Sequence, residues 1–572
     1  MPASRTPIGK TKLTVDGLGV VEGLSFFKNV HQFCGIPYAS LEKRWTRSQL
    51  KDSWPNDFHD GTKLGCSAPN PPEYNGPEDL LVPVHIAPHF QEPVEDELNC
   101  LVMNITTPTL KSDARLPVML YIHGGSFLFG GANKGVFDCV NLATYAAERD
   151  TPVVAINFNY RVGLGGFLAS AAIKADMERD GQKGVGNFGL YDQQVAFQWV
   201  NRYIASFGGD PDNVTIYGES AGGCSVSHHI VSKDPAPFHR AIAMSGHLNT
   251  IPTWPLEYHE RRYRALLRYL GIDADSPTAL DQLRAVPEHI VAAATLPIEG
   301  NFNATGNPCD DSVFHATTPH FDGFASPPCW LKGYMVGDTG DEAMIFTDAI
   351  VDEPYNSVKN SMSGFLGKDV SEAILNLYGM TPDQPREEFL QLLEVMIGDA
   401  VFKMHNWAAA HRSQVPQTFA YHFEQVCTHE SLFKGLSYHA LDLLYLFLNF
   451  DEKLTPGQHK LARTYANSFI DFAYGKDPWP RFSDGAKWML FGPEEESKVV
   501  TEEEDEALRR YTRMKKIVDM GVADDFVAAV DHFATHRDRL GAFDAGLQVS
   551  DTAGKEKPAE IDAAGMKEGV VA

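Results

Sequence analysis

The chain has 572 residues, 43% of them hydrophobic and 11% aromatic, which supplies enough apolar surface for a large folded core. Its 49 basic and 75 acidic residues give a formal net charge of −26, a sign that disfavours binding to nucleic acid or to anionic membranes. No stretch approaches the ~18 uninterrupted apolar residues of a membrane span, and residues 1–23 contain no signal peptide, so we expect a cytoplasmic protein.

The first part of the chain predicts two features that precede the main sheet. Up to about residue 60, glycine turns alternate with short β patterns, which indicates a small antiparallel edge. Residues 67–99 are rich in proline, glycine and asparagine and carry apolar patches such as 80–82. We expect residues 67–99 to form a long loop that acts as a flap or lid.

From residue 116 onward, apolar strand patterns alternate with helical patterns. Residues 116–122 and 152–158 are mostly apolar runs, typical of strands covered on both faces, and residues 193–204 have the period of an amphipathic helix. The alternation continues in later segments, with strands expected at 214–217, 241–245, 334–337 and 417–423 and helical segments at 221–231, 256–294, 382–412, 455–475 and 502–535.

This alternation predicts the fold class. Strands joined by helices require right-handed crossovers and therefore form a mostly parallel sheet. We expect an α/β fold with a large, mostly parallel central sheet and helices on both faces, in a single domain over residues 1–540. Residues 541–572 lose the apolar period and are rich in small and charged residues, so we expect a disordered tail.

One serine stands where an apolar strand pattern meets the start of a helix. Ser220 is the centre of Gly218-Glu219-Ser220-Ala221-Gly222. A serine at so tight a turn is held in a strained conformation with its hydroxyl outward, and the flanking glycines avoid collisions across the turn. The helix that follows directs its N-terminal amides and positive dipole end at the group that the oxygen attacks. The pattern G-x-S-x-G therefore predicts a nucleophile elbow.

A serine nucleophile needs a base and a carboxylate that orients the base, and in this architecture both follow the serine, the acid first. Glu342 is the candidate carboxylate because it lies in a turn-rich acidic loop after the strand at 334–337. Asp341 and Asp338 remain alternatives to it. His439 is the candidate base because a glycine-led loop presents it after the acid and just before an apolar helix. Other histidines fit structural or exposed positions better: His228, His229, His411, His422 and His429.

A glycine pair follows the strand at 116–122, in His123-Gly124-Gly125-Ser126. Glycines leave main-chain amides unshielded, so such a loop can stabilise an oxyanion. We expect the N–H groups of Gly125 and Ser126 to form an oxyanion hole together with the N–H of Ala221 at the elbow.

With these motifs the chain resembles the type-B carboxylesterase/lipase family, whose members include the cholinesterases and fungal lipases. The resemblance runs from about Phe33 to Phe450. It rests on an ordered series of motifs: Phe33-Cys34-Gly35-Ile36-Pro37-Tyr38-Ala39, the His123 loop, Asn159-Tyr160-Arg161, Gly186-Asn187-Phe188-Gly189-Leu190-Tyr191-Asp192-Gln193, Phe207-Gly208-Gly209-Asp210-Pro211, Gly218 to Gly223, Ser245-Gly246, the Asp341-Glu342 loop and the His439 loop.

The resemblance implies an α/β-hydrolase fold and a set of site residues. Ser220, Glu342 and His439 match the family's catalytic triad, with Glu219 and Ser245 beside it. No metal or organic cofactor is implied. The expected activity is hydrolysis of a carboxylic ester through an acyl-enzyme.

The chain also departs from the family pattern. The resemblance pairs Cys66 with Cys100 as a candidate disulfide around the flap, as in secreted relatives, but the missing signal peptide leaves the bonded and free forms both open. Ser126 stands where glycine or alanine is common, which leaves the amide in place. The aromatic choline platform of the cholinesterases is not recognisable within residues 67–99, which argues against a choline ester.

These observations leave several functions to compare. The favoured one is a carboxylic ester hydrolase acting on a small-molecule ester, with a secondary-metabolite or xenobiotic ester as the candidate substrate. One alternative is a triacylglycerol lipase in which residues 67–99 form an amphipathic lid. Another is a non-catalytic cholinesterase-like scaffold protein, which the complete set of triad residues argues against. Neither nucleic acid nor a membrane span is expected, and the oligomeric state stays open.

Overall fold

The computed structural model describes residues 6–72, 76, 89–235, 237–299, 306–321, 330–450 and 454–535. The predicted tail over residues 541–572 lies outside the described residues, and so do residues 73–75 and 77–88 of the predicted flap. No helix within the described ranges is both long and apolar enough to cross a bilayer.

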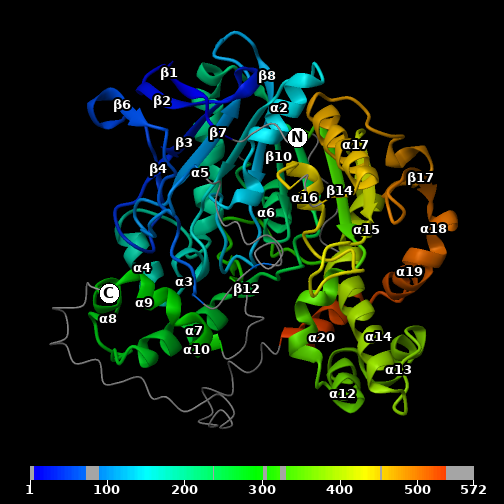
Figure 1. Ribbon diagram of the computed structural model, residues 1–572. Coiled ribbons are helices and arrows are strands. Elements are labelled where there is room, and N and C mark those ends of the chain that lie inside the picture. The colour runs from blue at the N-terminus through cyan, green and yellow to red at the C-terminus, as the bar shows by residue number, and fades with distance from the viewer. Residues whose placement is uncertain are drawn as a thin grey trace.

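A 13-stranded sheet forms the centre of the molecule (Figure 1). Its strand order is β1-β2-β3-β7-β9-β8-β10-β11-β14-β15-β16-β17, with β6 paired to β2. The strands of this sheet are β1 (Gly9–Val15), β2 (Gly19–Ser25), β3 (His31–Pro37), β6 (Phe58–Asp60), β7 (Val102–Thr107), β8 (Leu116–Ile122), β9 (Val154–Phe158), β10 (Gly209–Glu219), β11 (Arg240–Met244), β14 (Gly333–Thr339), β15 (Thr418–Phe423), β16 (Lys487–Phe491) and β17 (Ser497–Thr501).

The strand directions confirm the predicted fold class. From β9 through β8, β10, β11, β14 and β15 to β16, every neighbouring pair is parallel. The N-terminal strands β1, β2 and β3 pair antiparallel and form the predicted antiparallel edge, which β7 continues by pairing antiparallel to β3 and to β9. At the other end, β17 adds antiparallel to β16.

Both faces of the central strands are buried, because successive side chains enter two different cores. In β8, Val118, Leu120 and Ile122 pack into one core, whereas Met119 and Tyr121 pack into the other. This explains why the strand is a nearly continuous apolar run. The first core includes α5 (Phe188–Tyr203) and α6 (Ala221–Ile230), and the second includes α2 (Val140–Glu148), α16 (Asp442–Phe447) and α17 (Pro456–Ala473).

Two further groups of helices lie below the sheet in Figure 1. The first group shares a core of its own and consists of α3 (Gly163–Phe167), α4 (Ala171–Arg179), α7 (Leu256–Tyr269), α8 (Ala279–Arg284), α9 (Glu288–Ala293) and α10 (Thr295–Glu299). The second includes α11 (Thr347–Ile350), α12 (Tyr355–Leu366), α13 (Lys368–Leu377), α14 (Arg386–Gly398) and α20 (Ala523–Thr535).

The structure also shows where the sequence patterns were incomplete. The strand expected at 214–217 is the inner part of the longer β10, whose register shifts between Gly209 and Val214. The helix expected at 193–204 begins five residues earlier, at Phe188. Strands β7, β16 and β17 were not predicted: β7 precedes the alternation that begins at residue 116, whereas β16 continues it after α17 and pairs parallel to β15.

Candidate active site

Ser220 lies at the turn between β10 and α6, where the sequence predicts a nucleophile elbow. Its backbone dihedrals are φ 58° and ψ −124°, outside the regions that non-glycine residues normally occupy, so the turn is strained. A Cβ at Gly218 would lie 2.5 Å from the carbonyl carbon of Gly222, and a Cβ at Gly222 would lie 2.0 Å from the carbonyl oxygen of Ile122. Gly218 is therefore required by the close approach across the turn, and Gly222 by the close approach to the end of β8.

The loop after β8 lies against this serine. A Cβ at Gly124 would lie 3.0 Å from the Cβ of Ser220, so only glycine lets the two segments approach so closely. Ser220 and residues 124–126 are partly exposed to solvent. Both segments of this close approach therefore remain partly accessible to solvent.

The loop keeps its amides available while its carbonyls are bonded. The carbonyl of Gly125 accepts hydrogen bonds from the N–H groups of Leu128 and Phe129, and the carbonyl of Ser126 accepts one from Gly306 N–H. Within the described part of the chain, no group accepts a hydrogen bond from the N–H of Gly125, Ser126 or Ala221. These three donors are the ones that the sequence assigns to the oxyanion hole.

Side chains on both sides hold this loop in place. The ring of Tyr160 stacks on the ring of His123 with centroids 4.2 Å apart, and its hydroxyl donates to the His123 carbonyl at 2.9 Å. Burial lowers the pKa of His123 to about 3, so its imidazole is neutral. At the far end of the loop, the Oδ1 of Asn70 accepts a hydrogen bond from Gly130 N–H at 2.6 Å.

Glu342 begins the 3₁₀ helix η5 (Glu342–Phe346), just beyond the end of β14. Its Oε1 accepts a hydrogen bond from Thr339 N–H at 2.7 Å, and its Oε2 lies 2.5 Å from Nδ1 of His439. Burial alone would raise the pKa of Glu342, but the charge and hydrogen bond of His439 hold it below its ordinary value. The hydroxyl of Ser245 contributes in the same direction. The carboxylate is therefore ionised and aimed at the imidazole.

The two alternative carboxylates have other partners. The Oδ2 of Asp341 accepts a hydrogen bond from Ser437 N–H at 2.7 Å, and Asp341 N–H donates to the Ser437 carbonyl at 2.8 Å. These bonds join the acid loop to the loop that carries His439. Asp338 points the other way, to Arg509 and His422. Of the three acidic residues considered from the sequence, Glu342 is the one that contacts His439.

The other ring nitrogen of His439 faces a second carboxylate. Its Nε2 lies 3.1 Å from Oε1 of Glu219, the residue before the elbow serine. The Oε2 of Glu219 lies on the Gly124 side, 3.0 Å from where a Cβ of Gly124 would stand. No hydrogen bond joins the described side chains of Ser220 and His439, a geometry that often tightens only when substrate binds.

Two opposed effects set the protonation of His439. Burial lowers its pKa, but the carboxylates of Glu219 and Glu342 outweigh burial and raise it to about 9. The imidazole therefore holds its proton more tightly than a free histidine does, and the neutral form that can accept a proton increases as the pH rises.

The substitution Glu219→Gln tests this balance. It keeps the shape of the side chain but removes one of the two charges that raise the pKa of His439, so the neutral imidazole should form at lower pH. We expect the acid limb of the pH profile of kcat/KM for a soluble p-nitrophenyl ester to move to lower pH. The exposed Glu257→Gln is the matched control and should leave the limb in place. A limb that stays fixed or moves to higher pH in Glu219→Gln would contradict the assignment.

An irregular helical segment packs against the imidazole. The π-helical segment η6 (Asp399–Lys403) joins α14 to α15 (Met404–Arg412). Within it, the ring of Phe402 lies 5.0 Å from the ring of His439, and Lys403 Nζ donates to the Gly340 carbonyl at 2.6 Å. Sequence reasoning missed both residues, because they lie inside a continuous helical pattern that carries no local sign of a site.

The base of the predicted flap is closed by hydrogen bonds. Ser67 N–H donates to the Val94 carbonyl at 3.0 Å, and Asp96 N–H donates to the Ser67 carbonyl at 3.1 Å. The candidate disulfide is not present: Cys66 and Cys100 are both free thiols, and the Cys100 Sγ lies 3.4 Å from the Glu97 carbonyl. The backbone bonds close the loop at the position where the resemblance implied a covalent link.

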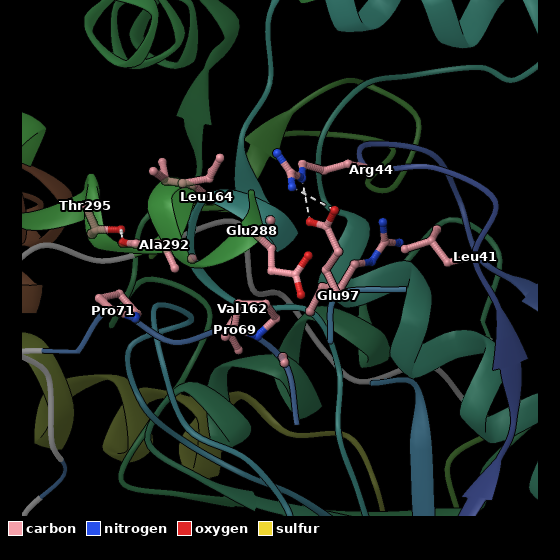
Figure 2. A pocket seen from close by; sticks show the side chains of 15 residues that line it. Leu41, Arg44, Pro69, Pro71, Glu97, Val162, Leu164, Glu288, Ala292 and Thr295 are labelled. Atoms are coloured by element: carbon pink, nitrogen blue, oxygen red, sulfur yellow. Dashed lines mark hydrogen bonds and ion pairs between the residues drawn. The ribbon is translucent and has the colours of Figure 1, made fainter. Parts of the chain in front are cut away.

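A small pocket lies beside this base (Figure 2). Pro71 and Ala292 line one side of it, and at the other side Glu97 forms a bidentate ion pair with Arg44 at 2.5 and 2.7 Å. None of the residues assigned to the triad or the oxyanion hole lines this pocket. It is therefore separate from the candidate active site.

The fold and the serine at its elbow define an α/β-hydrolase. The chain belongs to the carboxylesterase family, whose sequence profile matches residues 9–518. As a member of this family, the chain is a serine carboxylic ester hydrolase, and its substrate class is small esters.

Individual relatives are similar along most of their length. Lipase 3 of Yarrowia lipolytica (strain CLIB 122 / E 150) is 28% identical over 467 residues, which cover 79% of this chain and 86% of that protein. Para-nitrobenzyl esterase of Bacillus subtilis (strain 168) is 29% identical over 506 residues, or 84% of this chain and 94% of that protein. The solved structure of a thermophilic PNB esterase has a TM-score of 0.70 at 26% identity, covering 88% of this chain and 99% of its own.

Proposed function

We propose that Ser220, His439 and Glu342 form the catalytic triad of this hydrolase and that it acts through an acyl-enzyme. The observation that carries the proposal is the buried pair between Glu342 Oε2 and His439 Nδ1, 2.5 Å apart, beside the strained elbow of Ser220. A carboxylate on Nδ1 fixes the imidazole so that Nε2 is the nitrogen that exchanges protons.

The proposed steps use only groups of the chain and water. The Ser220 hydroxyl loses its proton to Nε2 of His439 while its oxygen attacks the ester carbonyl. The oxyanion that forms is stabilised by the N–H groups of Gly125, Ser126 and Ala221, and losing one such donor costs about 3 kcal/mol. The imidazolium then protonates the leaving alcohol, and the acyl group remains on the serine oxygen. Water, deprotonated by the same nitrogen, releases the acid and restores the serine.

Accessibility favours a soluble ester over an emulsified lipid. Ser220 and residues 124–126, the proposed oxyanion loop, are partly exposed in the structure, which supports access by a small ester. A lipase remains the second candidate, because three of the similar proteins are named lipases and because part of the predicted flap lies outside the described residues. A bulky secondary-metabolite or xenobiotic ester fits the same accessible serine.

A substrate series tests this choice. We expect hydrolysis of short-chain p-nitrophenyl esters with ordinary saturation, and no jump in rate when a long-chain ester or triacylglycerol passes its solubility limit. A few lactones in the same series test for cyclic natural esters. A steep rise in rate at the emulsion threshold would favour the lipase, and absence of turnover with every ester would contradict the proposed function.

A further inference from the structure

A buried cluster of charged groups lies directly behind the loop that carries Glu342. Its centre is Arg509, the last residue of α18 (Glu502–Arg509), whose side chain is only 2% exposed. Its Nη2 binds Oδ1 of Asp338, and its Nη1 donates to Oε1 of Glu424 at 2.8 Å. The same Nη1 lies 3.4 Å from the Thr339 carbonyl. One guanidinium therefore contacts two consecutive residues at the start of the acid loop.

Glu424 contacts the next part of the same loop. It follows the end of β15, and its Oε2 stands 2.5 Å from where a Cβ of Gly340 would be. From another direction, Lys403 Nζ donates to the Gly340 carbonyl at 2.6 Å. Arg509 and Lys403 therefore contact the segment from Asp338 to Gly340 from two directions. Glu342 follows Gly340 by two residues.

The helix that carries Arg509 is fixed at its start. Thr501 and Glu504 form a capping box at its N-terminus. Oε1 of Glu502 accepts a hydrogen bond from Trp407 Nε1 at 3.0 Å and lies 2.7 Å from His411 Nε2. These contacts fix the position of Arg509 relative to the sheet. Arg509 can therefore fix the position of the loop that carries Glu342.

We propose that Arg509 is a positioning residue for the proposed catalytic carboxylate: its guanidinium holds Asp338, Thr339 and Glu424 so that Glu342 stays in line with Nδ1 of His439. This inference rests on the proposed function. The planar fork of an arginine suits the role because it can bind two carboxylates and a carbonyl at fixed angles.

The charge states of the cluster agree with this role. Burial lowers the pKa of Arg509 to about 10, so the guanidinium remains charged at neutral pH. Burial also lowers the pKa of His422, Asp338's other partner, to about 4, so that imidazole is neutral. Arg509 is therefore the positive partner of Asp338 at neutral pH.

The protonation of Glu424 is set by opposed effects. Burial raises its pKa, whereas the charge of Lys403 lowers it. The charged and titratable groups that face Glu424 from the surrounding elements are Arg509, Lys403, His422, Asp341 and Asp505.

The experiment compares Arg509→Lys and Arg509→Met with the native chain. Lysine keeps the charge but loses the fork, and methionine loses both. We expect Arg509→Met to lower kcat about 100-fold with little change in KM, because a carboxylate displaced by about 1 Å no longer orients the base. Arg509→Lys should fall in between. The adjacent, exposed Arg510→Met is the matched control and should keep the native rate.

A second readout separates positioning from a purely structural role. If Glu342 moves away from Nδ1, His439 loses one of the charges that raise its pKa, so the acid limb of kcat/KM should move to lower pH. The downfield proton resonance of the Nδ1–H bond should weaken in parallel. Native kcat in both Arg509 variants, or a lower kcat with an unmoved limb and an unchanged resonance, would overturn the inference. If Arg509→Met does not fold, Arg509→Lys decides by the same criteria.

Glu424→Gln provides an independent variant that keeps the volume and an acceptor for Arg509. Because glutamine loses the charge that Arg509 binds, kcat should fall with little change in KM, and by less than in Arg509→Met. A native kcat in Glu424→Gln would count against the inference. If only the inference about Arg509 is wrong, Ser220→Ala is still inactive. If the proposed function is wrong, Ser220→Ala keeps its activity, so the two outcomes can be distinguished.

Discussion

Replacement of Ser220 by alanine is expected to lower kcat for p-nitrophenyl acetate by about 10⁴- to 10⁶-fold. The substitution removes the only atom that forms the acyl bond, while the oxyanion donors of Gly125, Ser126 and Ala221 stay in place. The remaining rate should be that of substrate held beside these donors with water as the nucleophile. Steady-state kinetics corrected for spontaneous hydrolysis measure the loss.

Folding must be unchanged for this result to be informative. Alanine fits the space of serine, so circular dichroism and thermal unfolding should match the native chain. Ser227→Ala, about two turns further along α6, removes a buried hydroxyl from the same helix and should keep the native rate. Substantial turnover by Ser220→Ala would reject Ser220 as the nucleophile.

The second large effect is expected from Glu342→Gln, with a loss of about 10⁴-fold in kcat. Glutamine keeps the shape but carries no charge and can present its NH₂ to Nδ1, which favours the wrong tautomer of His439. Because Glu342 also helps to raise the pKa of His439, the acid limb of kcat/KM should move to lower pH in the variant. The pH profile and kcat are measured together.

Asp341→Asn is the matched control for that variant. It neutralises the adjacent carboxylate on the same loop but retains an acceptor for Ser437 N–H. We expect a much smaller loss of kcat and no shift of the limb. A loss in Asp341→Asn as large as in Glu342→Gln would mean that the charge of the whole loop, rather than the contact with His439, is responsible.

The main features of the fold could be predicted because their signals are local. The strand at 116–122 matches β8 at both ends, since a nearly continuous apolar run is what a strand buried on both faces requires. The elbow could be predicted from Gly218 and Gly222, because a side chain at either position would collide with neighbouring backbone. Strands β16 and β17 were not predicted, although β16 follows α17 and extends the parallel part of the sheet beside β15; β17 then pairs antiparallel to β16.

The order of the proposed triad residues along the chain follows from the sequence, whereas the residues that surround them in the structure do not. Ser220, Glu342 and His439 follow the order that the chemistry and the fold demand. The 3.1 Å distance between Glu219 and His439 joins two segments that are more than two hundred residues apart in the chain. No local sequence pattern predicts it. Arg509 is the extreme case: in sequence it is one charged residue of a polar helix, and only the packing of α18 behind β14 brings it to Asp338.

The central claim is that an acyl-enzyme forms on Ser220, and covalent labelling tests it most directly. The native chain is treated with a fluorophosphonate, a stable mimic of the tetrahedral intermediate, and the modified peptide is located by mass spectrometry. We predict one equivalent of label, on the Ser220 peptide, with loss of esterase activity in proportion to labelling. Complete inactivation with the label on another residue, or full turnover of esters by a chain quantitatively labelled at Ser220, would contradict the account.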